Sequence, residues 1–143
     1  MYVLIDDLKK EHALVLEMLE NAKNYGILSK NGQDSLISIK ENLVAHLDKE
    51  EHELYPYLEK YAEKNEDFLE TLKFFEKKMN YIADYARSFF DKYIGVEEEL
   101  NFFTDFSVFF GLVKQRIRDE EEVIFKKYEE LLKEDELSAE SGF

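Results

Sequence analysis

Helix-breaking residues are scarce in this chain, which has one proline and five glycines among its 143 residues. Proline lacks the backbone donor that a helix interior needs, and glycine readily adopts the conformation that ends a helix. The sequence breaks at residues 24–32, at residues 61–67 and at Ile94-Gly95. Asp34 is the predicted N-cap after the first break, and Pro56 is predicted to end or kink the helix before the second. Four long segments without strong breaks remain.

Each of these segments carries its apolar residues at helical spacing rather than in alternation. The stripes are formed by Leu4, Leu8, His12, Val15, Leu19 and Ala22; by Leu36, Ile39, Leu43, His46, Glu50 and Leu54; by Leu72, Phe75, Glu76, Met79, Ile82, Ala86 and Phe89; and by Leu100, Phe106, Phe109, Val113, Arg116, Glu120, Ile124 and Leu131. Four amphipathic helices with short links predict an all-α fold, an antiparallel up-down-up-down four-helix bundle that spans residues 1–143 as a single domain. The acidic end, from about residue 134, is predicted to be a solvated and partly disordered tail.

Composition excludes several classes of function. Nineteen basic and 33 acidic residues give a net charge of −14, which argues against nucleic acid or an anionic membrane as partner. The absence of cysteine excludes disulfides, thiolate catalysis and thiolate metal sites. Asp6 and Asp7 interrupt the first apolar run, and no stretch approaches the roughly 18 apolar residues of a membrane span. These features predict a soluble cytoplasmic protein.

Six polar residues stand on the apolar stripes, namely His12, His46, Glu50, Glu76, Arg116 and Glu120. An ionised carboxylate is costly to bury alone, so these acids require a cation, a proton or a metal. His46 and Glu50 are four residues apart and share a helix face, and Arg116 and Glu120 repeat that spacing. Antiparallel packing with level midpoints would bring all six into one layer. Mixed imidazole and carboxylate groups bind iron, manganese or zinc, which makes the two histidines and three glutamates candidate ligands.

Each of these residues also fits an ordinary structural role. A single histidine on an apolar face is commonly a satisfied core residue, and Glu76 has Lys73 and Lys77 beside it at the rim of its stripe. The Arg116–Glu120 pair reads as an intrahelical salt bridge. His52 lies off the face that carries His46 and is expected to face solvent. It is the joint alignment on four stripes that favours a site.

Two segments of the chain can be laid over one another. Residues 46–55 match residues 116–125, with an inward acid at the fifth place, a second acid after it, and an aliphatic-aromatic pair at the end. The first copy opens with His46, a residue type that binds metals. The second opens with Arg116, whose guanidinium stays protonated and never coordinates a metal.

These motifs resemble the hemerythrin-like (HHE cation-binding) domain family. The matching text is residues 8–12, residues 46–51 running on to residues 54–56, and residues 119–125. The resemblance implies a four-helix bundle with a non-haem di-iron centre, which binds or senses dioxygen, handles nitric oxide, or stores and senses iron. It implies ligands at His12, His46, Glu50 and Glu120. The family also has histidine on the third helix and at the head of the last motif, where this chain offers Glu76 and Arg116.

Charge decides between the possible occupants of the layer. Glu50, Glu76, Glu120 and Arg116 together leave two net negative charges, which one divalent ion neutralises. The leading hypothesis is therefore one tightly held ion or a markedly unequal pair, with iron first and zinc or manganese as alternatives, and with a small diatomic gas as a further partner. In a second reading Arg116 swings outward and all five candidate ligands hold two metals that activate oxygen. In a third, Arg116 replaces the metal in a metal-free interaction or scaffold module.

Aromatic residues make up 15% of the chain, with 12 phenylalanines and nine tyrosines. The phenylalanines of the third and fourth helices surround those helices: Phe74, Phe75, Phe89, Phe90, Phe102, Phe103, Phe106, Phe109 and Phe110. A helix that is apolar on more than one side commonly packs against another subunit. The pattern predicts a homodimer formed through the third and fourth helices, and the alternative is a thick core rich in aromatic residues.

Overall fold

The computed structural model describes residues 3–96 and 101–141, and within these residues the regular structure is entirely helical. Helix α1 (Val3–Ala22) is the first rod. Helix α2 (Lys30–Lys49), the π-helical segment η1 (Glu50–Leu54) and helix α3 (Tyr55–Ala62) form the second, and α4 (Glu66–Tyr93) is the third. Helix α5 (Phe102–Asp119), the π-helical segment η2 (Glu120–Phe125) and helix α6 (Lys126–Ser141) form the fourth. The predicted all-α class is confirmed.

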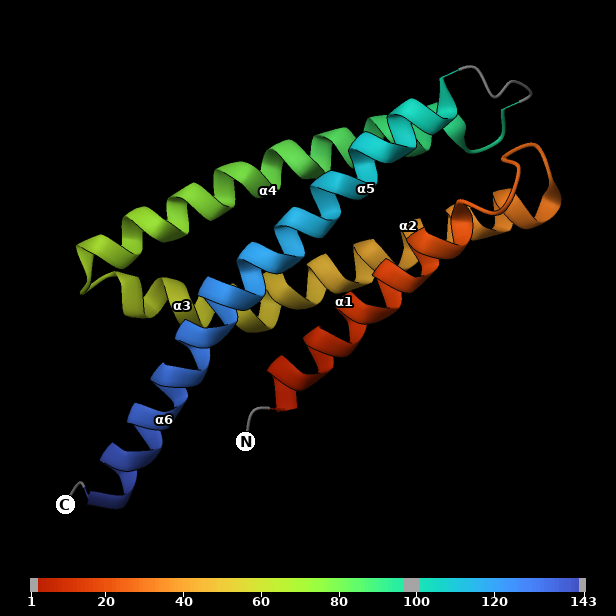
Figure 1. Ribbon diagram of the computed structural model, residues 1–143. Coiled ribbons are helices and arrows are strands. Elements are labelled where there is room, and N and C mark those ends of the chain that lie inside the picture. Colours follow the sequence, from red (N-terminus) through yellow and green to blue (C-terminus); the bar gives the residue numbers. More distant parts are fainter. Residues whose placement is uncertain (1–2, 97–100, 142–143) are drawn as a thin grey trace.

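The four rods run up, down, up and down (Figure 1), so the predicted antiparallel bundle is also confirmed. Helix α1 packs beside α2, and α4 packs beside α5. Helix α6 extends past the end of the bundle, near the end where α1 begins (Figure 1). The backbone is helical through Ser141, and Glu134 and Asp135 are exposed.

Helix α2 begins earlier than the sequence predicts, so the break between α1 and α2 is shorter. Ser29, rather than Asp34, is the N-cap of α2: its hydroxyl oxygen accepts a hydrogen bond from the backbone N–H of Gly32 at 3.0 Å and donates to the carbonyl of Gly26 at 2.6 Å. A Cβ at position 32 would lie 2.0 Å from that same carbonyl oxygen, so this close approach requires glycine. The serine cap therefore adds a full turn to the helix.

Pro56 does not end the second rod. It stands in the first turn of α3, directly after η1, where the backbone has already left the α-helical hydrogen-bond pattern. The actual break follows Ala62, and the side chain of Asn65 caps α4 by accepting from the N–H of Phe68 at 3.0 Å. The predicted stop at Ile94-Gly95 is confirmed, since α4 ends at Tyr93 and Gly95 has a φ of +80°.

The core consists of two apolar clusters at the two ends of the bundle. One joins α1, α2, α4 and α5 near the loops, where Phe89 stacks on Phe109 with ring centroids 4.7 Å apart. The other joins α1, η1, α3, α4, η2 and α6. Of the nine phenylalanines that predicted an exposed interface, only Phe74 and Phe103 are exposed, so most of them build the core.

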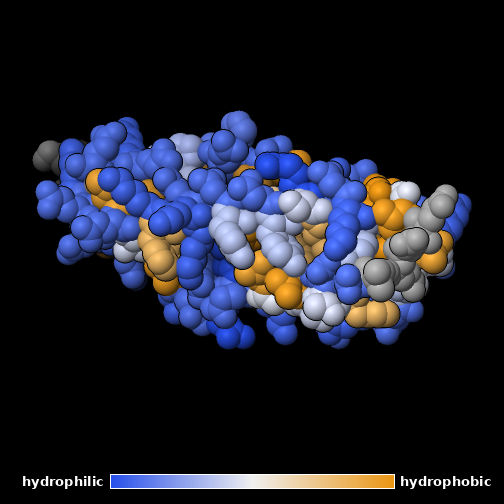
Figure 2. All heavy atoms as spheres, turned by 90° about the horizontal axis from the view of Figure 1, so that it is seen from above, coloured by the Kyte–Doolittle hydropathy of each residue, from blue (hydrophilic) through white to orange (hydrophobic). Residues whose placement is uncertain are grey.

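The face seen from the α4 side is mainly hydrophilic, with apolar patches scattered among the polar residues (Figure 2). Within the described residues no helix combines the length and the apolar character that a membrane crossing demands.

Candidate metal centre

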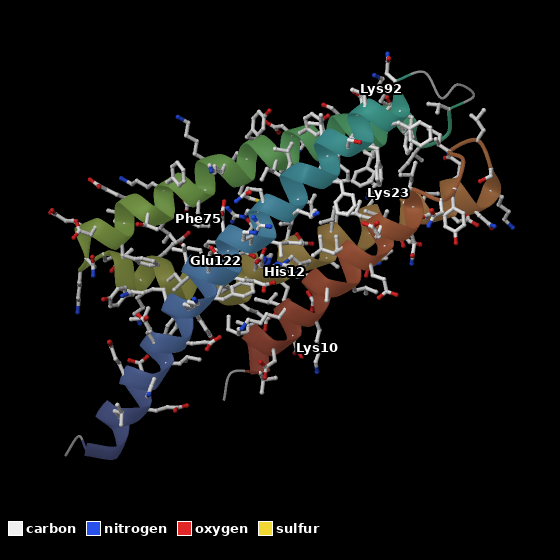
Figure 3. The ribbon with its side chains drawn as sticks, viewed as in Figure 1. Lys10, His12, Lys23, Phe75, Lys92 and Glu122 are labelled. Atoms are coloured by element: carbon white, nitrogen blue, oxygen red, sulfur yellow. The ribbon has the colours of Figure 1, made fainter. Side chains whose placement is uncertain are left out.

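A layer of buried polar side chains separates the two apolar clusters. It consists of His12, His46, Glu50, Arg116 and Glu120, each at most 7% exposed. His12 comes from α1, His46 from α2, and the two glutamates open η1 and η2. Figure 3 shows His12 of α1 and Phe75 of α4 near the middle of the bundle, while Lys10 and Lys92 point away from it. Five of the six residues that were expected to share one layer are buried in it, and the sixth, Glu76, is not.

Four of these residues offer ligand atoms to a common point. One atom each from His12, His46, Glu50 and Glu120 lies within 4.8 Å of all the others. Two imidazoles and two carboxylates at this spacing fit a first-row divalent metal.

Both imidazoles are oriented by carboxylates outside the cluster. Nδ1 of His46 lies 2.9 Å from a carboxylate oxygen of Glu11, whose other oxygen accepts from Lys49 at 2.9 Å. Nδ1 of His12 lies 2.7 Å from a carboxylate oxygen of Glu121. A histidine that donates its Nδ1–H to a carboxylate keeps its Nε2 lone pair for a metal. Both Nε2 atoms therefore face the cluster, where each could offer its lone pair to a metal.

The two glutamates of the cluster differ in protonation. Burial, together with the neighbouring Glu120 carboxylate, raises the pKa of Glu50 well above its usual value. Burial alone would also raise the pKa of Glu120, but hydrogen bonds with Glu50 and His12 and the charge of Arg116 hold that pKa below its usual range. Burial and the adjacent His12 lower the pKa of His46, so this imidazole stays neutral near pH 7. Without a metal, the Glu50–Glu120 pair therefore holds one proton, on Glu50, and one negative charge, on Glu120.

Arg116 points into the bundle, which settles the orientation that the sequence left open. Its Nη1 donates to the carbonyl of Phe75 at 3.0 Å, and its Nη2 donates to the hydroxyl of Tyr55 at 2.6 Å and to Oε2 of Glu120 at 3.1 Å. The Tyr55 hydroxyl donates to the same Oε2 at 2.8 Å. Only Oε1 of Glu120, which lies 3.1 Å from Nε2 of His12, is left on the side of the cluster.

Glu76 lies outside this layer. It is exposed on α4 beside Glu59, and partial burial with the Glu59 hydrogen bond raises its pKa. The expectation that it faces the core is wrong, because Phe75 takes the inward position and the next residue is turned about 100° away. The two-metal reading required Glu76 inward and Arg116 outward, and neither condition is met.

Both acids of the cluster open a π-helical segment. In η1 the N–H of Tyr55 donates to the carbonyl of Glu50, five residues earlier in the chain. Because the π-helical turn is wider than an α-helical turn, Tyr55 lies closer to the helix face that carries Glu50. Tyr55 then reaches Glu120, and in η2 Phe125 stacks on the ring of His12 at 5.2 Å with an angle of 5°. Both π-helical segments lie within the repeated motif. Its last residue is aromatic in both copies, Tyr55 in the first and Phe125 in the second, and in both it contacts the cluster.

Sequence reasoning missed the supporting roles of Glu11, Glu121 and Tyr55. A signal was present, since Glu11 directly precedes His12 and Glu121 directly follows Glu120. Each carboxylate contacts a histidine of another helix: Glu11 of α1 contacts His46 of α2, and Glu121 of η2 contacts His12 of α1. His52 is exposed, as expected, and its Nδ1 contacts the carbonyl oxygen of Asp48 at 2.7 Å.

Such a cluster, in the middle of an antiparallel four-helix bundle, defines a helical cation-binding protein. The family model of the hemerythrin HHE cation binding domain matches residues 3–128. The chain belongs to this family. Neither the comparison with curated proteins nor the comparison with solved structures found a match.

Proposed function

We propose that this protein binds one divalent metal ion, iron in the first place, through His12, His46, Glu50 and Glu120. The observation that carries this proposal is that Nε2 of His46 and Oε2 of Glu50 are buried without a hydrogen-bond partner among the described residues. A buried polar atom left unpaired costs about 1–3 kcal/mol. A metal ion bound by both atoms removes that cost.

The charge of the layer supports a single ion. With Glu50 and Glu120 ionised and Arg116 protonated, the layer carries one net negative charge, and a divalent ion leaves one net positive charge. A second ion would stand beside the Arg116 guanidinium and raise that charge to about +3, which a buried site cannot hold without further anions. Glu120 also cannot bridge two ions while Arg116 and Tyr55 occupy its second oxygen.

The ligand set supports iron, with zinc and manganese as alternatives. Iron at such a site supplies reversible binding of a small diatomic molecule such as oxygen or nitric oxide. The chain supplies part of the surroundings: Leu54, Ile124 and Phe125 are fully buried in the apolar cluster at one end of the bundle, next to the polar layer. We propose that the protein binds or senses such a gas, or iron itself.

Metal titration of two histidine variants tests the site. His46→Ala is expected to abolish high-affinity binding of iron(II) and zinc, whereas His52→Ala, on the exposed side of the same motif, is expected to bind as wild type does. Calorimetric titration under anaerobic conditions measures both. Equal binding by the two variants would contradict the site, and an unchanged visible spectrum on adding nitric oxide to the iron(II) form would contradict the gas-binding part.

A metal-free interaction module is the second candidate. It is favoured by the two terminal nitrogens of the Arg116 guanidinium, which are both hydrogen-bonded within the protein. A wild-type protein that binds neither iron, zinc nor manganese would support this candidate over the first.

We also propose that the protein forms a homodimer, through the exposed aromatic residues of α4 rather than through both the third and fourth helices. Phe74 and Tyr81 are 56% and 62% exposed on α4, and they supply an apolar surface for a second copy. Sedimentation at micromolar concentration is expected to show a dimer that Phe74→Ser weakens. A monomer at that concentration would contradict the proposal.

A further inference from the structure

A cavity of about 250 Å³ lies between α2, α4 and α5, next to the polar layer. Its inner end is formed by residues of the layer, and its walls are apolar. The wall residues that matter below are Leu43, Val44, Ile82, Ala83, Ala86 and Phe90. The cavity reaches the surface, because Lys40, Val44 and Arg87 in its lining are exposed.

The cavity follows from small side chains on α4. Ala83 and Ala86 face α2 across this space, whereas Phe75 and Phe89 fill the core on either side of it. Protein interiors pack densely and hold few voids larger than a water molecule. A single metal ion fills only a small part of such a volume. An apolar space of this size next to a polar site is therefore suited to a small organic molecule.

The surface end of the cavity is positively charged. Lys40 and Arg87 are the charged residues of the lining outside the polar layer, in a protein with a net charge of −14. Lys40 has no ion pair among the described residues, and Arg87 contacts only the exposed carboxylate of Asp84, at 3.1 Å. Both cations are accessible to an anionic group at the opening.

We propose that this cavity binds a medium-chain monocarboxylate, with its carboxylate between Lys40 and Arg87 and its alkyl chain directed inward past Ala83 and Ala86. At roughly 30 Å³ for each water-sized group, the volume holds roughly eight non-hydrogen atoms. A sugar would leave its hydroxyls unpaired against these walls, and a peptide is too large. The site goes beyond the proposed metal binding and uses none of the four ligand atoms.

Calorimetric titration of the full chain with octanoate tests the proposal, on both the metal-free and the zinc-loaded protein. Saturable binding is expected in both forms, so a failure of metal binding would leave this result unaffected. Ala83→Leu narrows the cavity and is expected to weaken octanoate binding about tenfold or more. Ala13→Leu makes the same change on the exposed face of α1 and is expected to leave binding unchanged.

Two further measurements test the contacts of the carboxylate and of the alkyl chain separately. Lys40→Gln and Arg87→Gln are each expected to weaken octanoate binding about threefold, as the loss of an exposed ion pair does, and to leave 1-octanol binding unchanged. Butanoate and hexadecanoate are expected to bind the wild type more weakly than octanoate, a comparison that needs no variant to fold. No saturable octanoate binding, equal binding by a folded Ala83→Leu variant, or affinity independent of chain length would each overturn the proposal.

Discussion

Each imidazole of the cluster is fixed by a carboxylate from a different helix. Glu11 of α1 holds His46 of α2, and Glu121 of η2 holds His12 of α1. Three of the rods are thereby joined at one level by charge-assisted hydrogen bonds. The same contacts determine which ring nitrogen faces the cluster, so the packing of the helices and the orientation of the candidate metal ligands depend on the same residues.

Glu11→Gln is expected to lower metal affinity without removing a ligand. The amide is a weaker acceptor for Nδ1–H than the carboxylate, so the imidazole of His46 becomes less basic, and affinity should fall about 10–100-fold. Competition with a chromophoric zinc chelator measures this change. Glu20→Gln, which alters only the exposed pair with Lys23, is the matched control. Equal affinity in the two variants would show that Glu11 has no supporting role.

Arg116→Met is expected to destabilise the metal-free protein. The change leaves the buried charge of Glu120 without its cation, and breaking such a pair costs about 3–5 kcal/mol. Zinc should restore more stability to this variant than to the wild type, because the ion then supplies the missing positive charge. Urea unfolding with and without zinc measures both effects. Arg118→Met, on the exposed side of α5, should change the free energy of unfolding by less than about 0.5 kcal/mol.

The difference between Glu120 and Glu76 shows what single-residue reasoning can predict. Glu120 stands on its stripe four residues after Arg116 and four before Ile124, so its inward position followed from spacing. Glu76 is adjacent to Phe75 at the rim of a stripe, and spacing alone does not decide which of two neighbouring residues turns inward. That choice depends on Arg116, whose guanidinium lies over the Phe75 ring at 5.0 Å and bonds its carbonyl.

At the scale of elements, the π-helical segments are the feature that periodicity could not predict. A stripe drawn with one constant period assumes that every turn holds the same number of residues, but η1 and η2 each contain a wider turn. The repeated motif at residues 46–55 and 116–125 marked both places. The sequence did not reveal that the repeat encodes a change of helix type.

The two glycines of α2 and α5 should respond oppositely to alanine. Gly32→Ala would place a Cβ against the carbonyl of Gly26 and is expected to cost about 1–3 kcal/mol. Gly111→Ala meets no atom within 4 Å on an exposed helical face and should stabilise the protein by about 0.5–1 kcal/mol. Thermal unfolding followed by circular dichroism compares the two, and shifts of the same sign would contradict the described start of α2.

The end of α4 is joined to the start of α5 by an acid-sensitive contact. Asp105 accepts from Lys92 at 2.8 Å and from the hydroxyl of Tyr93, and these bonds lower the pKa of Asp105 below 3.8. A carboxyl group whose pKa is lower in the folded state stabilises the protein at pH values above its unfolded-state pKa. This stabilisation is lost as the pH falls through its folded-state pKa. Lys92 itself has a raised pKa, so it stays charged throughout this range.

Lys92→Gln is therefore expected to lower the melting temperature at pH 7 and to match the wild type below the lowered pKa of Asp105. Thermal scans at pH 7 and at a series of decreasing acidic pH values measure the difference, which should shrink to zero as Asp105 becomes protonated. Lys126 is exposed on the fourth rod, and its side chain has no ion pair or hydrogen bond among the described residues, so Lys126→Gln should have no effect at any of these pH values. A Lys92→Gln deficit of the same size at all of these pH values would contradict this account.

For the molecule as a whole, the sequence predicted the bundle because four amphipathic segments have few other ways to bury their apolar faces. It also predicted four of the five candidate ligands within the cluster. It did not predict the cavity beside α4, which depends on how far apart two helices stand rather than on the pattern of either one. We propose that, at the level of the polar layer, Arg116 takes the place and the charge of a second metal ion.

Elemental analysis of the iron(II)-saturated chain, freed of excess metal without oxygen, tests that claim most directly. The charge of the layer predicts about one iron ion per chain, and about none for Glu120→Gln with Glu50→Gln. Two iron ions bound per chain with similar affinity would contradict it.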